Sequence, residues 1–279
     1  MSHFLNTLDQ IVHSESVSTV EGLRRHGQWQ IRKLLNLFPC SLPIAGSQLY
    51  VDRPGGVAAL VNAMGEYDYN NMELLRLVMS RGDSTFFDIG ANIGAYTLIG
   101  SEIPNSSVVS IEPHPYTFSL LKRNVELNSR GNVICLNIAV SDADGVVFFS
   151  DYSESCLNRV LKPEEMEPQS LRVACQRVDE ICLGLKTEPD FVKIDVEGHE
   201  PHVLEGFGNL IGKTKMFFIE RGERPEIRVF LEDAGYSGPW FFHLKQKRMR
   251  KDRQPREEDS IYMELQYLTE LKRMGIMIS

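Results

Sequence analysis

The chain has 279 residues, of which 42% are hydrophobic and 24% are charged, and its net charge is −8. This composition excludes a disordered or low-complexity protein, and the acidic balance argues against a dedicated nucleic-acid binder. No apolar run reaches the roughly 18 residues of a membrane-spanning helix, and the five cysteines include no Cys-x-x-Cys pair, so we expect a cytoplasmic protein without disulfides or structural zinc.

The first 45 residues predict helices that form a cap on the main domain. Apolar residues recur there at near-helical spacing: Val20, Leu23, Trp29, Ile31, Leu34, Leu35 and Leu37. Basic residues flank this pattern at 24, 25, 32 and 33, so a helix on a membrane surface is the alternative. The same segment could also join two copies of the chain into a homodimer.

From residue 48 onward the pattern alternates between strands and helices. Strands are expected over 48–62, with a turn at Pro54-Gly55-Gly56, and an amphipathic helix over 70–80. Further strands are predicted over 85–89, 107–112, 132–140, 146–150, 172–177, 190–196, 215–220, 238–244 and 260–266, with 132–140 and 146–150 as a hairpin. Helices are predicted over 94–102, 115–128, 179–186, 200–210 and 224–234.

This alternation predicts an α/β fold with a doubly wound, mostly parallel, seven-stranded sheet. We therefore divide the chain into an N-terminal helical cap, 1–45, and a second domain, 46–279. Within that domain the irregular segment 151–171 is expected to be an insertion that faces the substrate.

The ends of the first two strands predict a nucleoside site, because ligands of such sheets bind beyond the C-terminal strand ends. The first strand runs into "DIGANIG", residues 88–94. Glycine tolerates positive φ and lets a ligand approach the backbone, and the helix that follows offers free N–H groups. The second strand ends at Glu112, which can accept hydrogen bonds from both hydroxyls of a ribose. A tight turn with a capping acid is the alternative.

The glycine spacing distinguishes between nucleoside cofactors. A dinucleotide site requires Gly-x-Gly-x-x-Gly, whereas Gly90 and Gly94 are separated by three residues. The carboxylate of Asp88 would repel a pyrophosphate but suits a cationic amino-acid portion. S-adenosylmethionine carries an ammonium, a sulfonium and a ribose but no phosphate, so it is favoured over NAD. An NAD-dependent oxidoreductase is the alternative that this spacing disfavours.

The third and fourth strands end in residues of different character. Ala139, Val140 and Ser141 are small or apolar and suit an adenine ring, although an ordinary turn explains them equally well. The fourth strand, "DFVKIDVEGHE", places Lys193, Asp195 and Glu197 on one face. Charges in a central strand are costly unless they are paired or used, so this face indicates either a site or a structural ion pair around Lys193.

These stretches together resemble the FkbM-type family of S-adenosylmethionine-dependent methyltransferases, which have the class I methyltransferase fold. The matching segments are "GEYDYNNMELL" (65–75), "FFDIGANIGAYTL" (86–98), "SIEPHPYTFSLLKRNVELN" (110–128), "NIAVSDADG" (137–145) and "FVKIDVEGHEPHVLEGF" (191–207). The resemblance extends from about residue 48 to about residue 236. Many members O-methylate sugars, polyketides or other small natural products, so the resemblance implies an O-methyltransferase with a hydroxylated small-molecule acceptor.

The resemblance also implies a set of site residues. It places Asp195 beside the methionine portion and the substrate, and Tyr67 near the cofactor. With the residues at the strand ends, the full set expected to bind S-adenosylmethionine is Tyr67, Asp88, Gly90, Asn92, Gly94, Tyr96, Glu112, Pro113, Ala139, Val140, Ser141 and Asp195.

A hydroxyl acceptor must lose its proton near the moment of methyl transfer. His199 is the expected base, because an unperturbed histidine pKa of about 6.5 suits neutral pH; a solvent-facing histidine at a helix start is the alternative. We take His199, Asp195 and Glu197 as the catalytic set. Asp195, Glu197 and Glu220 could instead collect around a divalent ion, but we expect no absolute metal requirement.

Two further features concern the acceptor. The chain contains no Pro-Pro pair, which enzymes that methylate adenine amino groups carry after the fourth strand, so an oxygen acceptor is favoured. The run "KQKRMRKDRQPR", 245–256, has seven basic residues in twelve. Such a run can bind phosphates, so a phosphate-bearing or nucleic-acid acceptor is the alternative to a solvated loop.

Overall fold

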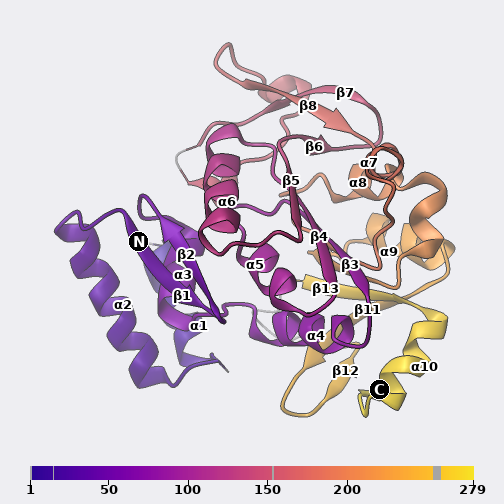
Figure 1. Ribbon diagram of the computed structural model, residues 1–279, viewed down its shortest axis with the longest axis horizontal. Coiled ribbons are helices and arrows are strands. Elements are labelled where there is room, and N and C mark those ends of the chain that lie inside the picture. Colours follow the sequence, from indigo (N-terminus) through magenta and orange to yellow (C-terminus); the bar gives the residue numbers. More distant parts are fainter. Residues whose placement is uncertain (1, 15, 153, 254–258) are drawn as a thin grey trace.

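A mixed sheet forms the centre of the molecule (Figure 1). The computed structural model describes residues 2–14, 16–152, 154–253 and 259–279. Within those ranges the sheet has nine strands. In spatial order they are β14 (Met277–Ile278), β12 (Arg248–Arg250), β11 (Tyr236–His243), β13 (Asp259–Glu264), β10 (Met216–Glu220), β9 (Phe191–Ile194), β3 (Ser84–Ile89), β4 (Ser106–Ile111) and β5 (Val133–Leu136).

The strands from β10 to β5 are all parallel, and β13 pairs antiparallel with both β10 and β11. The seven strands from β11 to β5 confirm the predicted mostly parallel sheet, and β12 and β14 extend it at one edge. The chain passes from β3 outward to β5 and then returns to β9 beside β3. The order therefore reverses between β3 and β9, which is where parallel sheets bind ligands.

Helices cover both faces of the sheet, and consecutive strand residues explain why. Phe86 packs into one core and Phe87 into the other, as expected of a strand buried on both faces. The first core includes α4 (Tyr69–Met79), α5 (Ala95–Glu102) and α10 (Leu265–Arg273). The second includes α7 (Val178–Leu185), α8 (Glu200–Glu205) and α9 (Pro225–Asp233). The helix α6 (Pro115–Leu127) packs beside β5.

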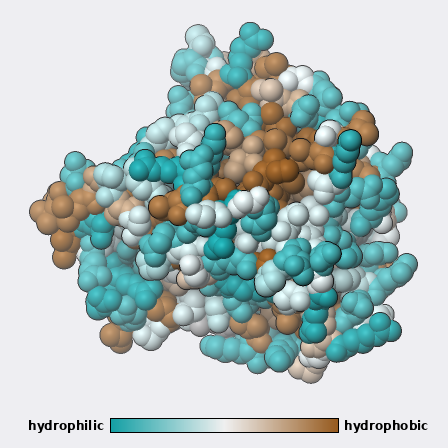
Figure 2. Space-filling view, in the orientation of Figure 1, coloured by the Kyte–Doolittle hydropathy of each residue, from teal (hydrophilic) through white to brown (hydrophobic). Residues whose placement is uncertain are grey.

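The N-terminal segment lies beside the sheet, at the left of Figure 1. It comprises α1 (Ser2–Val12), α2 (Thr19–Leu34), β1 (Cys40–Ile44), β2 (Ser47–Val51) and α3 (Gly56–Met64). The helix α2 buries Gly22, His26 and Trp29, and Trp29 contacts Phe38 edge-on with ring centroids 5.3 Å apart. Of the seven apolar residues whose spacing predicted this helix, only Trp29 is buried. Figure 2 accordingly shows apolar surface over this part of the molecule.

Two predictions for this segment are wrong in detail. Residues 40–44 form a strand rather than a helix, because Leu42 pairs with Leu49 in the hairpin of β1 and β2 and both side chains are buried. Residues 56–64 form α3 rather than a strand. A short apolar run such as "VAALV" fits either element, and here the Glu154 carboxylate accepts a hydrogen bond from the first helical amide, Gly56 N, at 2.6 Å.

The predicted hairpin between 132–140 and 146–150 is also wrong. The first segment divides into β5 and β6 (Ala139–Val140), and β7 (Gly145–Phe149) pairs with β8 (Leu171–Gln176) in a separate sheet of order β6-β8-β7. The connection from β7 to β8 contains two short 3₁₀ helices, η1 (Ser155–Leu157) and η2 (Pro163–Glu165). The predicted helix 200–210 ends at 205 and is followed by η3 (Gly208–Lys213).

The remaining elements agree with the sequence within a few residues, except that α10, β12 and β14 were not predicted. The five cysteines are free thiols, as expected. None of the helices in the described part of the chain has the length and apolarity needed to cross a bilayer.

Candidate active site

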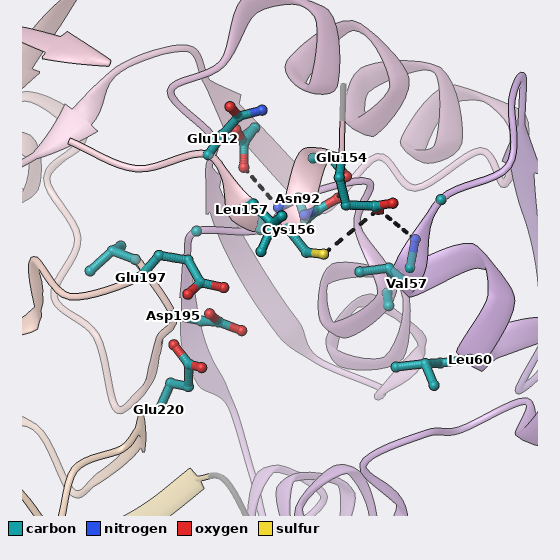
Figure 3. A pocket seen from close by; sticks show the side chains of 18 of the residues that line it. Val57, Leu60, Asn92, Glu112, Glu154, Cys156, Leu157, Asp195, Glu197 and Glu220 are labelled. Carbon is teal, nitrogen blue, oxygen red and sulfur yellow. Dashed lines mark hydrogen bonds between the residues drawn. The ribbon is translucent and has the colours of Figure 1, made fainter. Parts of the chain in front are cut away.

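A cavity of about 550 Å³ opens where β3, β4, β9 and β10 end (Figure 3). Gly90, Glu112, Asp195 and Glu220, which lie at or just after those strand ends, form part of its wall. The opposite wall comes from α2, α3 and η1. The cavity thus lies at the reversal of strand order, the position that the topology favours for a ligand.

The turn after β3 brings backbone to the surface of the cavity. Gly90 has φ +85°, and an added Cβ would lie 1.8 Å from the carbonyl oxygen of Asp195, so only glycine fits. Asn92 also has positive φ, and its Oδ1 accepts hydrogen bonds from Ile93 N at 2.9 Å and Ser155 Oγ at 3.2 Å. The turn leaves a bare stretch of backbone that a ligand can approach closely.

Asp88 lies at the base of the cavity and is 2% exposed. The hydroxyl of Thr97 donates a hydrogen bond to its Oδ2 at 2.6 Å. Burial raises the pKa of Asp88 to about 6, although the Thr97 bond and the Lys193 ammonium oppose the shift. A cation in the cavity would favour the ionised form of this acid.

Glu112 lies in the cavity wall, where two backbone hydrogen bonds fix its carboxylate, and it is 6% exposed. Its Oε2 accepts a hydrogen bond from Asn92 N and its Oε1 from His114 N, each at 2.9 Å. Burial raises its pKa to about 7, against the effect of these two bonds. Each carboxylate oxygen can accept more than one hydrogen bond, so Glu112 can still accept from hydroxyl groups of a ligand.

Two tyrosines add phenol groups to the cavity wall. Tyr67 and Tyr96 both line the cavity. Tyr96 donates a hydrogen bond to Asp68, and its ring lies 5.0 Å from Lys193 Nζ. Burial raises the pKa of both phenols, so they remain neutral hydrogen-bond donors.

Three carboxylates converge on the side of the cavity formed by β9 and β10 (Figure 3). One oxygen from each of Asp195, Glu197 and Glu220 lies within 4.8 Å of the other two. Burial, followed by the charges of Asp195 and Glu197, raises the pKa of Glu220 well above its ordinary range. Arg221 Nη2 lies 3.3 Å from Glu220 Oε1 and 3.9 Å from Glu197 Oε2.

Lys193 lies beneath this cluster and is 3% exposed. Its ammonium donates a hydrogen bond to Asp195 Oδ2 at 3.0 Å and lies 3.3 Å from Asp259 Oδ2. The charges of these two acids outweigh the effect of burial and raise the pKa of Lys193. The structural ion pair weighed from the sequence is therefore present, and it coexists with carboxylates that face the cavity.

The predicted base, His199, is half-buried and lines the cavity. Its Nε2 lies 2.9 Å from Ser141 Oγ, and that hydroxyl donates to Asp142 Oδ1 at 2.9 Å. Because serine has one hydroxyl proton, Nε2–H must donate to Ser141, which leaves the lone pair on Nδ1. The ring stacks on His202 with centroids 4.3 Å apart. Burial, followed by the charge of His202, lowers the pKa of His199 to about 4. The ordinary pKa of about 6.5, on which the sequence-based choice of this base rested, therefore does not hold here, and the neutral imidazole is a weaker base than expected.

Ten of the twelve residues expected to bind the cofactor line the cavity, as do all three members of the expected catalytic set. Gly94 and Ser141 do not. Gly94 has φ +96° and turns the chain into α5, and Ser141 lies behind His199.

The sequence analysis expected 151–171 to face the substrate, but it named no individual residue of the opposite wall. Among its side chains are those of Trp29, Val57, Leu60, Cys156 and Leu157. The irregular composition of 151–171 and the turn at 54–56 were the signals available. The basic run 245–256 does not contribute to the cavity through its described residues, because none of 245–253 lines it. Residues 254–256 lie outside the described residues.

A family model and the curated relatives both identify methyltransferases. A family model described as "Methyltransferase FkbM domain" matches residues 88–237. The hexuronic acid methyltransferase AglP of Haloferax volcanii is 30% identical over 151 residues, which cover 53% of this chain and 61% of AglP. Methyltransferase 1 of Beauveria bassiana is 27% identical over 181 residues, which cover 56% of this chain and 73% of that protein. The match thus spans about three fifths of the length of AglP.

The chain also resembles solved structures. TYW2 of M. jannaschii, in complex with AdoMet, is 16% identical with a TM-score of 0.41, over 81% of this chain and 87% of that chain.

Proposed function

Because the chain belongs to the methyltransferase FkbM domain family, we propose that it transfers a methyl group from S-adenosylmethionine to a hydroxyl of a small molecule, a sugar or another natural product. The observation that carries this proposal is the cavity, in which a bare backbone turn and an anchored acid adjoin a cluster of carboxylates. The turn after β3 and the Glu112 carboxylate suit a nucleoside, and the carboxylate cluster suits a hydroxylated acceptor.

The cavity residues fit S-adenosylmethionine on structural grounds. The Glu112 carboxylate lines the cavity and is already oriented by two backbone amides. Glu112 would accept the ribose hydroxyls, and Ala139 and Val140 would contact the adenine. Asp88 and Asp195 favour a cationic methionine portion over a pyrophosphate.

When bound, S-adenosylmethionine supplies a methyl group that its sulfonium has already activated. The chain must then hold the acceptor in line and accept its hydroxyl proton. We assign the orientation of the acceptor to Asp195 and Glu197, whose carboxylates accept hydrogen bonds from its hydroxyls. We assign the proton to His199 Nδ1, because the imidazole is neutral at neutral pH and Nε2 is bonded to Ser141.

The acceptor class rests on two observations. AglP is by name a hexuronic acid methyltransferase. In the present chain, Val57 and Leu60 add apolar side chains to the wall opposite the carboxylates (Figure 3), as suits the faces of a sugar ring or a polyketide. Both residues lie outside the family match of 88–237, so we attribute acceptor choice to the N-terminal segment together with the insertion 151–171.

The alternatives receive less support. A phosphate-bearing or nucleic-acid acceptor recruited by 245–256 would have to reach the cavity from a run whose described residues do not line it. Family membership and the glycine spacing both disfavour the NAD-dependent oxidoreductase.

Calorimetric titration with S-adenosylhomocysteine tests the cofactor. We expect micromolar binding that Glu112→Ala abolishes, whereas Glu126→Gln, an exposed carboxylate of α6, binds like the wild type. Binding of NAD in place of S-adenosylhomocysteine would contradict the proposal.

Transfer of labelled methyl groups to sugar acids, neutral sugars and polyketides, with an RNA control, then tests the acceptor. NMR of the product establishes whether oxygen carries the methyl group, and methylation of RNA alone would contradict a small-molecule acceptor.

A further inference from the structure

We propose that Asp195, Glu197 and Glu220 form a binding site for a hard divalent cation, Mg²⁺ or Mn²⁺, in the wall of the cavity. This inference rests on the proposed function in one respect: the cation would hold the hydroxyl that accepts the methyl group. It departs from the sequence-based expectation that no metal is required.

The first observation is the convergence of donor atoms. The three carboxylates come from the ends of β9 and β10 and point toward one another (Figure 3). One oxygen from each lies within 4.8 Å of the others. In an octahedral ion with metal–oxygen distances of about 2.1 Å, opposite oxygens are about 4.2 Å apart. Small side-chain rotations therefore suffice for all three to reach one ion.

The second observation is an oxygen atom without a partner. Glu220 is 6% exposed, and no group in the described part of the chain donates a hydrogen bond to its Oε2. Its other oxygen, Oε1, lies 3.3 Å from Arg221. A buried carboxylate oxygen without a donor costs free energy. A metal ion supplies the missing contact, because Glu220 is directed toward the other two acids (Figure 3).

The third observation is the charge balance. Lys193 and Arg221 lie beside the cluster and form ion pairs with its acids. Three ionised carboxylates this close to one another repel, and a divalent ion bound between them would offset that repulsion. Lys193 also bonds to Oδ2 of Asp195, so one carboxylate ligand is already held in position.

The donor type selects the ion. All three ligands are carboxylate oxygens, which Mg²⁺, Mn²⁺ and Ca²⁺ prefer and which softer ions do not. Three protein ligands leave coordination positions for water and for an acceptor oxygen. A hydroxyl bound there would lose its proton more readily, and His199 lines the same cavity to receive it.

Electron paramagnetic resonance of Mn²⁺ tests the site on the chelator-treated full chain. We expect the free Mn²⁺ signal to fall by one equivalent per chain and to return when Mg²⁺ is added in excess. Glu220→Gln should weaken Mn²⁺ binding at least tenfold. Glu154→Gln, which alters a carboxylate of the same cavity outside the cluster, should bind Mn²⁺ within twofold of the wild type. Absence of Mn²⁺ binding by the wild type at millimolar concentration would overturn the proposal, as would equal binding by Glu220→Gln.

Thermal melting guards against a misfolded variant. The Gln side chain keeps the shape of Glu220 and removes one charge from the cluster. We therefore expect the melting temperature of metal-free Glu220→Gln to equal or exceed that of the wild type. Added Mn²⁺ should not change the melting temperature of this variant. Mn²⁺ should raise the melting temperature of the wild type.

The same samples, titrated with S-adenosylhomocysteine, separate the two proposals. If the chain binds the nucleoside but not Mn²⁺, only the metal proposal is contradicted. If it binds Mn²⁺ but not the nucleoside, only the cofactor proposal is contradicted. Glu220→Gln could weaken the binding of S-adenosylmethionine while the wild type binds no Mn²⁺. In that case the carboxylates interact with the positive charges of the cofactor, and the metal proposal is wrong.

Discussion

Gly90 shows how one residue sets the shape of the cavity. Replacing it with alanine would place a Cβ 1.8 Å from the Asp195 carbonyl in addition to straining a φ of +85°. Gly65→Ala is the matched control, because its φ is +72° but an added Cβ there meets nothing within 4 Å. We expect Gly65→Ala to cost about 1 to 2 kcal/mol and Gly90→Ala more than about 3 kcal/mol. Urea unfolding measures both, and equal losses would contradict the steric argument.

Glu112 predicts how affinity for S-adenosylhomocysteine depends on pH. Burial raises its pKa to about 7, and in the proposed complex the ribose hydroxyls would donate to its ionised form. Binding therefore releases a proton, and affinity should fall about tenfold from pH 8 to pH 6. Asp88 also titrates near this range, with a pKa of about 6, so Glu112→Gln is the required comparison. Calorimetry across this range should show a dependence in the wild type that exceeds the one left in the variant.

The sequence predicted residues better where their function depends on neighbours in the chain. Gly90 and Glu112 follow strands that periodicity alone identifies, so their place at the strand ends could be inferred. The state of His199 could not, because its partner Ser141 is 58 residues away in the sequence. Burial, which is the main cause of its lowered pKa, has no signature in the local sequence.

At the scale of elements, Glu154 connects the insertion to the N-terminal segment. Its carboxylate accepts the hydrogen bond from Gly56 N at the start of α3, where the helix dipole also favours a negative charge. We expect Glu154→Ala to cost about 1 to 2 kcal/mol and Glu154→Gln less, because the amide oxygen can still accept. Hydrogen exchange should be faster at the first amides of α3 in the alanine variant, and unchanged exchange would contradict the link.

Helices and strands could be predicted where their own sequence pattern determines them, and not where a contact with a distant segment does. The parallel strands from β3 to β10 have long apolar runs between turn residues and lie within a few residues of their predicted ranges. The segment 56–64 has an equally apolar sequence, but the hydrogen bond at its first helical amide comes from Glu154, 98 residues away in the sequence. The partner of β7 is β8 rather than β5, a choice between strands that the sequence pattern of β7 does not encode.

At the scale of the whole molecule, the exposed side of α2 predicts a homodimer. Val20, Leu23, Ile31 and Leu34 are exposed and share one face with Gly27, because the spacings are 3, 4, 4 and 3 residues. This pattern reads the same in both directions. Two antiparallel copies would therefore pair residue 20 with 34 and residue 23 with 31, around Gly27, where an added Cβ would meet nothing within 4 Å.

Analytical ultracentrifugation tests this prediction. We expect a dimer of the wild type and a monomer of Ile31→Lys, while Leu183→Lys, at an exposed leucine of α7, remains a dimer. A monomeric wild type at all concentrations would contradict it, and flotation of the wild type with anionic liposomes would indicate the membrane-surface alternative.

The two walls of the cavity have different origins, and this bears on how such a protein can diversify. The turn, Glu112 and the carboxylates belong to the β-strand framework, whereas Trp29, Val57 and Leu60 belong to α2 and α3, outside the segment that matches the family. Under the proposed function, substitutions in those helices would change the acceptor that is accepted, while the strand ends would keep the same methyl donor.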